Sequence, residues 1–227
     1  MKKLNTLIVL AGLTFNSPAR PAGGYAGDSI NETNNLLFPN KGDGEKCYDA
    51  STHILNFGIG FGNPSYQSLY RGAGYSYGIT PATSLSYEQP LPKKLGPGYL
   101  GVGAYFGYQH EHENYNNVYY YNSVNYYYNH SWNYFMIAAR AAYHWDVLNS
   151  KNAEVYAGAI IGVRIQTYTY STNDPGQHDP YTYNEGSVFP AYTVFAGARW
   201  YFAKRVGVFG EVGYGISYLT GGISLKF

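Results

Sequence analysis

Eight segments of this chain carry apolar residues at every second position, and this alternation limits the fold more than any other feature. Side chains of a β-strand point alternately to its two faces, so each segment is expected to form a strand with one apolar face. The predicted strands span residues 54–61, 82–89, 99–110, 133–146, 154–168, 191–202, 206–214 and 219–227. The second strand can begin as early as Tyr75, with Pro81 at an edge or a bulge.

Charged residues inside these segments lie on the face opposite to the apolar one. Glu88, Arg140, Arg164, Arg199 and Glu211 are all out of phase with the apolar positions of their segments. A soluble β-sandwich turns its apolar faces inward, but here those faces are rich in Ala, Val and Gly, and no helix is predicted to cover them. A sheet that closes with its apolar side outward explains the pattern better.

An inward polar face predicts a network of buried charges. The interior of an eight-stranded barrel is just wide enough for side chains to fill, and an unpaired charge there would be costly. Opposite charges are therefore expected to meet in a lumen network of Glu88, Arg140, Glu154, Arg164, Arg199 and Glu211. The alternative is a narrow gated pore through the same interior.

The connections between the segments alternate in length. The connections after the second, fourth and sixth strands are short, at residues 90–98, 147–153 and 203–205, and those after the first, third and fifth are long, at 62–81, 111–132 and 169–190. Short periplasmic turns and long extracellular loops are typical of outer-membrane barrels. Both termini are then expected on the periplasmic side.

The N-terminus reads as a secretory signal, with Lys2 and Lys3 before a short apolar stretch and cleavage after Ala19 or Ala26. We therefore expect a signal peptide in residues 1–26, a polar periplasmic or lumen-threading segment in 27–52, and a barrel in 53–227. The net charge of +1 gives no electrostatic case for a nucleic-acid partner. Cys47 is the only cysteine, so no intrachain disulfide is expected.

The sequence ends on an alternating strand, with Ile223, Leu225 and Phe227 on one face. This ending resembles that of bacterial outer-membrane barrels, where it serves as the assembly signal and the closing strand. Together with the strand pattern and the loop asymmetry, it makes residues 53–227 similar to the small eight-stranded outer-membrane family of the OmpA membrane domain and OmpX-like proteins. The resemblance implies an all-β, antiparallel, up-and-down transmembrane barrel in a Gram-negative outer membrane. It also implies membrane lipid and the barrel assembly machinery as partners. From the residues themselves we expect no cofactor and no catalysis.

The second long connection is rich in Tyr and Asn, which binding loops favour for stacking area and adaptable hydrogen bonds. A structural or surface-interaction role, in adhesion or recognition of an extracellular glycan or protein, is therefore the expected function. The alternative is a Tyr-rich strand extension without a ligand. The candidate contacts are Tyr115, Tyr119, Tyr120, Tyr121, Tyr126, Tyr127 and Tyr128.

Two further chemistries have candidate residues but little support. His110 and His112 lie two apart on one strand face, as weak metal candidates, but only two ligands are local, so no metal site is predicted. A lipid-modifying hydrolase or acyltransferase would need a His with a Ser or Asp near the extracellular rim. The candidates by position are His110, His112, His130, Ser131, His178 and Asp179, and no G-x-S-x-G motif accompanies them.

Overall fold

The computed structural model describes residues 46–62, 74–121, 124–148, 150–176, 182–215 and 217–227; of residues 117–121, 124 and 182–184 it describes the backbone alone. The predicted signal peptide and residues 27–45 of the polar segment lie outside this part of the chain. The strands are β1 (Ile54–Phe61), β2 (Tyr75–Ile79), β3 (Ala82–Pro90), β4 (Gly98–Tyr121), β5 (Val124–Trp145), β6 (Ala153–Thr172), β7 (Thr182–Tyr201), β8 (Val206–Tyr214) and β9 (Leu219–Lys226). In the described residues we find no helix of the length and hydropathy needed to cross a membrane.

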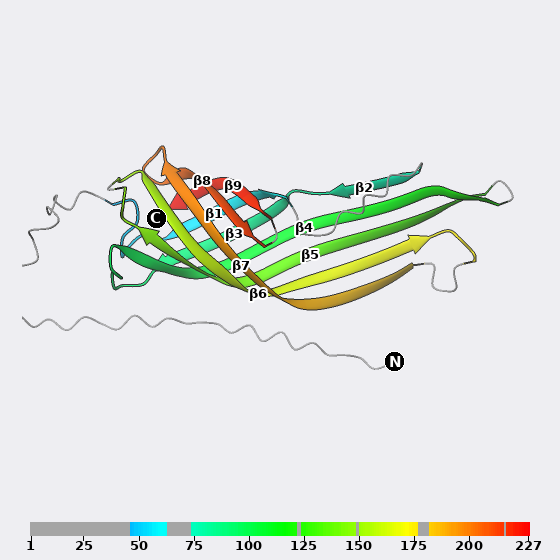
Figure 1. Ribbon diagram of the computed structural model, residues 1–227, viewed down its shortest axis with the longest axis horizontal. Helices are drawn as coiled ribbons and strands as arrows, with labels where there is room; N and C mark the ends of the chain where they lie inside the picture. The colour runs from blue at the N-terminus through cyan, green and yellow to red at the C-terminus, as the bar shows by residue number, and fades with distance from the viewer. Residues whose placement is uncertain (1–45, 63–73, 122–123, 149, 177–181, 216) are drawn as a thin grey trace, which may run out of the picture. The chain divides into compact units, whose positions relative to one another are not determined.

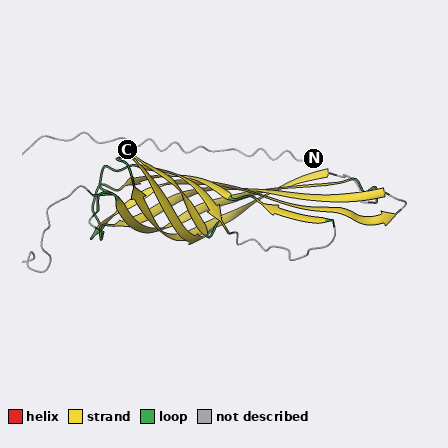
Figure 2. Cartoon of the chain, turned by 90° about the horizontal axis from the view of Figure 1, so that it is seen from above, coloured by secondary structure: helices red, strands yellow, loops and turns green. Residues whose placement is uncertain are grey.

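Eight of these strands form a closed antiparallel ring. From β3 to β9 each strand pairs with the next in sequence, and β1 closes the ring by pairing with both β3 and β9. Figures 1 and 2 show the ring from two directions. The predicted eight-stranded antiparallel barrel is thereby confirmed.

The predicted second strand is divided into two pieces. β3 pairs with the ring portion of β4, whereas β2 pairs with Glu111–Tyr115 further along the same strand. Pro81 lies between them and has no amide hydrogen to donate to the ladder. Thr80 keeps the two pieces in line, since its amide donates to the carbonyl oxygen of His110 over 2.9 Å.

Strands β4 to β7 continue past the ends of the other ring strands, as Figure 1 shows. The connection expected at 111–132 is therefore mostly a hairpin: Glu113 pairs with His130 and Tyr115 with Tyr128, with one irregularity between Asn116 and Tyr120. The connection expected at 169–190 is shortened in the same way by β6 and β7. The second connection thus has the form of the Tyr-rich strand extension that was the alternative to a binding loop. The strand ends were placed too early, because the outward side of these stretches is polar and the apolar alternation stops there.

The ring is apolar outside and polar inside. Ile137, Ile161 and Val194 point outward and are 54%, 71% and 67% exposed, whereas Arg140 and Arg199 point inward and are 2% exposed. A side-chain period of two imposes this division on every strand, because a shift by one residue would exchange the faces.

This polarity inverts where β4 to β7 leave the ring. One row of cross-strand neighbours on the outward side is apolar: Tyr108, Phe135, Ile165 and Val188. The next outward row, two residues further along each strand, is polar or small: His110, Asn133, Thr167 and Gly186. Beyond that row the outward side stays polar, while the inward side becomes aromatic. The same strands therefore pass through two different environments.

Candidate functional site

A network of buried charges crosses the lumen. Arg140 on β5 reaches Glu88 on β3, with 2.9 Å between Nε and Oε1. The two terminal nitrogens of the same guanidinium donate hydrogen bonds to Glu211 on β8, Nη2 to Oε1 at 2.5 Å and Nη1 to Oε2 at 3.2 Å. The planar guanidinium thus joins carboxylates from opposite parts of the ring with its fixed set of donors.

His144 completes the charge balance of this network. Its Nδ1 lies 3.0 Å from Glu154 and its Nε2 lies 3.0 Å from Glu88. Carboxylates only accept hydrogen bonds, and a neutral imidazole has one N–H, so both contacts require the imidazolium form. Arg199 pairs with Glu154. The three carboxylates are then matched by two guanidinium groups and one imidazolium.

The structure brings five of the six expected residues together and leaves out Arg164. This side chain lies further along β6, where Met136 and Phe189 are its cross-strand neighbours. Its guanidinium is 5.6 Å from the ring centroid of Tyr134 and 5.7 Å from that of Phe189. It makes no ion pair with any described residue. His144 was missed, although it shares the inward phase of Arg140 on the same strand.

The lumen is filled on both sides of the network. At the turn end, the ring of Tyr48 stacks on His144 with 3.7 Å between centroids, and the amide of Cys47 donates to Ser150 over 3.1 Å. Burial, followed by the charge of Glu154, raises the pKa of the Cys47 thiol to about 12. On the other side an apolar cluster packs against the charges: Tyr105, Met136, Ala138, Ala142, Tyr156, Ile160 and Phe195.

The remaining space in the lumen is small. Two cavities bordering the network and the apolar cluster measure about 10 and 30 Å³. A single water molecule needs on the order of 10–15 Å³ by this measure, so neither cavity has room for more than one or two. Residues 46–52 of the predicted polar segment therefore close the turn end of the barrel from within.

Beyond the ring, five side chains form a cluster on the inward side of β4, β5 and β6. We call this cluster the aromatic face; it consists of Tyr115, His130, Trp132, Tyr168 and Tyr170. His130 lies at its centre, stacked on Trp132 at 5.9 Å and hydrogen-bonded to the Tyr168 hydroxyl at 2.6 Å. Desolvation lowers the pKa of His130 below its ordinary value, which keeps the imidazole neutral near pH 7.

Two carboxylates border the aromatic face. Glu111 accepts hydrogen bonds from the hydroxyls of Tyr77 and Tyr134, at 2.8 and 3.1 Å. Glu113 accepts one from Tyr115 at 2.7 Å. Glu111 is buried, whereas Glu113 is partly exposed and has further lone pairs, so the face offers an acceptor beside stacked rings.

The tyrosines singled out in the sequence divide between the two sides of the extension. Tyr115, Tyr126 and Tyr128 share the inward phase, whereas Tyr127 points outward and is 36% exposed. The side chains of Tyr119, Tyr120 and Tyr121 lie outside the described part of the structure. The sequence analysis did not include Trp132, Tyr168 and Tyr170 among the candidate contacts. They lie outside the Tyr- and Asn-rich stretch from which those candidates were chosen.

Of the weaker candidates, His130 belongs to the aromatic face, whereas His110, His112 and Ser131 lie on the opposite, outward side. The rings of His110 and His112 are stacked at 5.8 Å, and His110 Nδ1 is 3.0 Å from the Asn133 side-chain oxygen. Among the described residues, no three His, Cys, Asp or Glu side chains gather as metal ligands would. Ser131 is the cross-strand neighbour of His112. His178 and Asp179 lie outside the described residues.

Replacing Arg140 by Met should destabilise the barrel, because Glu88 and Glu211 would stay buried without their partner. Removing one member of a buried ion pair costs about 3–5 kcal/mol. Arg164→Met is the matched control, since it makes the same change where only aromatic contacts worth about 1 kcal/mol are lost. Urea unfolding of both variants in one detergent measures the difference. Equal losses would contradict a paired network.

A filled lumen should carry no steady ion current. The purified protein in a planar bilayer is therefore expected to show no stable conductance steps, because Tyr48, the charge network and the apolar cluster occupy the path. Reproducible single-channel steps from the unmodified protein would contradict this expectation.

Comparison with known proteins finds similarity among solved structures alone: no protein-family model and no curated protein matches the chain. The N-terminal β-barrel domain of OprF from Pseudomonas aeruginosa matches at 14% identity and a TM-score of 0.37, over 78% of this chain and 98% of that one.

Ail, the attachment invasion locus protein of Yersinia pestis, matches in two structures over 77% of this chain and 93% of that one. The complex with the heparin analogue sucrose octasulfate gives 8% identity and a TM-score of 0.37, and the second structure gives 10% and 0.33. These likenesses are distant. The closed antiparallel ring itself shows that the chain has the fold of a small eight-stranded barrel, as its resemblance to that family implied.

Proposed function

We propose that this chain is an integral outer-membrane protein whose filled barrel holds the aromatic face above the bilayer for recognition at the cell surface. The observation that carries the proposal is the inversion of polarity along β4 to β7. An apolar exterior suits strands that face lipid, and a polar exterior suits the same strands once they enter water.

The height of the apolar exterior supports a bilayer as its surroundings. On β5 the outward side is apolar from Phe135 to Trp145, a separation of ten positions. At about 3.4 Å per residue and a tilt of about 40°, this corresponds to roughly 26 Å along the membrane normal. Transmembrane barrels carry an apolar band of about 25 Å.

The turn lengths support the orientation. Within the described residues β7 and β8 are joined by a turn in which the Ala203 amide donates to the Val206 carbonyl over 3.1 Å. The elongated strands leave the other end. Since short turns are periplasmic in outer-membrane barrels, the aromatic face is assigned to the outside of the cell. Contact of β9 with the barrel assembly machinery through Ile223, Leu225 and Phe227 belongs to the same proposal.

A glycan or a protein surface is the class of ligand that the aromatic face suits. Rings with a polar tip supply rigid contact area and hydrogen bonds together, and here they lie on paired strands rather than on a free loop. Glu113, which is partly exposed, adds an acceptor for hydroxyl or amide donors. The proposal assigns the chain no catalytic step and no cofactor.

A charge placed on the apolar exterior of the ring should lower the stability of the barrel in a bilayer. A charge placed on the outward side of the strands above the bilayer should have little effect on stability. Ile137→Lys is expected to lower the free energy of unfolding in lipid vesicles by about 2–4 kcal/mol, and Thr167→Lys by less than about 1 kcal/mol. Both side chains point outward on exposed positions. Urea titration of folded barrels in vesicles measures both. If the two variants lose the same stability, the surface does not face lipid.

Two neighbouring cross-strand pairs allow a matched test of recognition. Trp132 and Tyr168 pair on the aromatic face, and Ser131 and Thr169 pair beside them on the outward side. Replacing Trp132 and Tyr168 by Ala should weaken binding by at least about tenfold, since aromatic anchors carry most of the energy of an interface. The Ser131→Ala, Thr169→Ala variant should bind as before.

The measurement is binding of bacteria that display each variant to a glycan array and to cultured epithelial cells. Heat-modifiable gel mobility confirms that both double variants fold. Recognition through the aromatic face is refuted if the folded Trp132→Ala, Tyr168→Ala variant binds both surfaces as well as the unmodified protein.

A further inference from the structure

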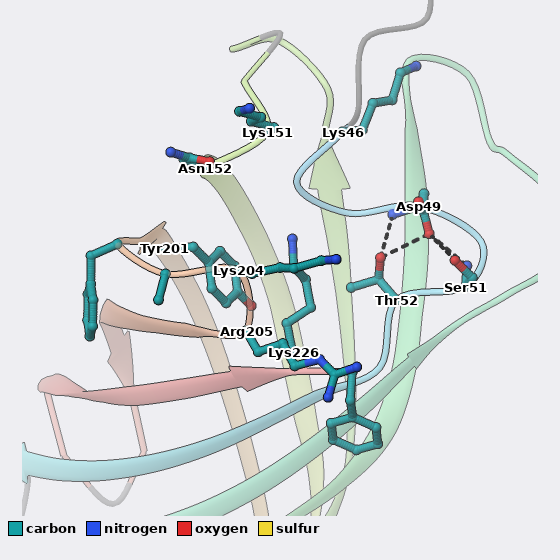
Figure 3. Close-up of a pocket in the computed structure, with 13 residues that line it drawn as sticks. Lys46, Asp49, Ser51, Thr52, Lys151, Asn152, Tyr201, Lys204, Arg205 and Lys226 are labelled. Carbon is teal, nitrogen blue, oxygen red and sulfur yellow. Dashed lines mark hydrogen bonds between the residues drawn. The ribbon is translucent and has the colours of Figure 1, made fainter.

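The turn end of the barrel carries a basic cleft that the recognition proposal does not use. The cleft measures about 670 Å³, and Figure 3 shows the side chains around it. Its cationic side chains are Lys46, Lys151, Lys204, Arg205 and Lys226. Among the described residues that line it, Asp49 is the one acidic side chain.

Asp49 offsets only one of the five positive charges. Its Oδ1 accepts hydrogen bonds from the Ser51 amide at 2.8 Å, the Ser51 hydroxyl at 2.7 Å and the Thr52 hydroxyl at 2.9 Å. Burial acts to raise the pKa of Asp49, but these hydrogen bonds and the charge of Lys226 outweigh it and hold that pKa below its ordinary value. The Asp49 carboxylate is thus ionised, and its Oδ1 already accepts hydrogen bonds from Ser51 and Thr52 of the same loop.

Three of the cations are available to a ligand. Lys46 pairs with Asp146 at 2.6 Å, and Lys226 donates to the Cys47 carbonyl oxygen at 3.3 Å. Lys151, Lys204 and Arg205 are exposed and form no ion pair with any described residue. A small anion entering the cleft would therefore meet cations that have no internal partner.

Backbone hydrogen bonds hold the walls of the cleft in place. The Lys226 amide donates to the Arg205 carbonyl at 2.8 Å, which joins the β7–β8 turn to the end of β9. The Tyr201 amide donates to Asn152 at 2.7 Å, and the Cys47 amide to Ser150 at 3.1 Å. The cations are thus carried on segments that are already fixed, so little ordering is left to offset binding.

Apolar rings lie beside the cations. Phe202 and Phe227 line the cleft and are 57% and 60% exposed, and Trp200 lies next to Phe202 with 6.1 Å between ring centroids. Aromatic rings at a barrel end favour the headgroup level of a bilayer, and Lys and Arg there attract anionic lipids. A ligand that combines a phosphate group with acyl chains would match both the cations and the exposed aromatic rings.

We propose that the cleft binds the phosphate group of an anionic phospholipid. The proposal rests on the barrel lying in a bilayer, as inferred above. Phosphate is the shared chemistry of a lipid headgroup and a free phosphate ion, and the exposed rings favour the lipid.

The test uses the full mature protein folded into nanodiscs of phosphatidylcholine with a minor fraction of phosphatidylglycerol. Native mass spectrometry after gentle detergent release counts each lipid retained by the barrel. The unmodified protein should retain phosphatidylglycerol preferentially. The Lys151→Gln, Lys204→Gln, Arg205→Gln variant should lose at least about tenfold in that preference, since each cation near an anionic lipid contributes about a fivefold factor. Lys93→Gln, which removes an exposed cation from a different turn, should retain it.

The outcomes separate the two proposals. If the unmodified protein fails to enter the nanodiscs, as judged by heat-modifiable mobility, both proposals fail. If it inserts but retains both lipids in proportion to their abundance, the lipid site alone is refuted. The lipid site is also refuted if the triple variant keeps the preference for phosphatidylglycerol. It is refuted as well if millimolar inorganic phosphate abolishes that preference and the detergent-released protein binds phosphate without lipid, because the cleft is then a site for the free ion.

Discussion

The pairing of Arg140 with Glu88 and Glu211 is the interaction on which the rest of the barrel depends. A guanidinium inside so narrow a ring cannot reach bulk water, so it persists only where carboxylates from other strands come to it. The network draws β3, β5 and β8 together across the lumen. Side chains of the described residues fill the middle of this barrel, so both candidate sites lie at its two ends.

The glycine content of the chain follows from the same constraint. At Gly101 a Cβ atom would lie 2.5 Å from the Tyr48 hydroxyl oxygen and 3.1 Å from His144 Nε2. At Gly197 it would lie 2.8 Å from the Glu211 side chain. These inward positions lack side chains because large charged and aromatic residues from opposite strands occupy the space. At these two positions a glycine faces a large side chain from another strand, which is how small and large residues together fill a narrow barrel.

The sequence predicted the ring well and the site only partly, for reasons that particular residues make clear. Alternation located all eight ring strands because lipid-facing and lumen-facing positions differ sharply in polarity. Above the ring the phase of the alternation inverts, with aromatic residues inward and polar residues outward, so the segments that were apolar in one phase were ended at that point. Arg164 has the correct phase but lies too far along β6 to reach Glu211, and phase alone gives no position along the barrel axis. His144 and Trp132 were missed for a different reason. The sequence shows that both lie in the inward phase of β5, but it does not show which residues of other strands they contact.

The filled lumen also separates the two candidate sites. The aromatic face and the basic cleft lie at opposite ends of β5 and β6, with the charge network and the apolar cluster between them. The packed interior between the two sites is satisfied by its own hydrogen bonds and ion pairs. A substitution at one end of the barrel therefore leaves the contacts at the other end unchanged. The proposed surface recognition and the proposed lipid binding therefore use separate sets of residues, which can be changed one set at a time. Selection on the outer tyrosines leaves the charge network intact, because Tyr115 and His130 contribute no bond to it.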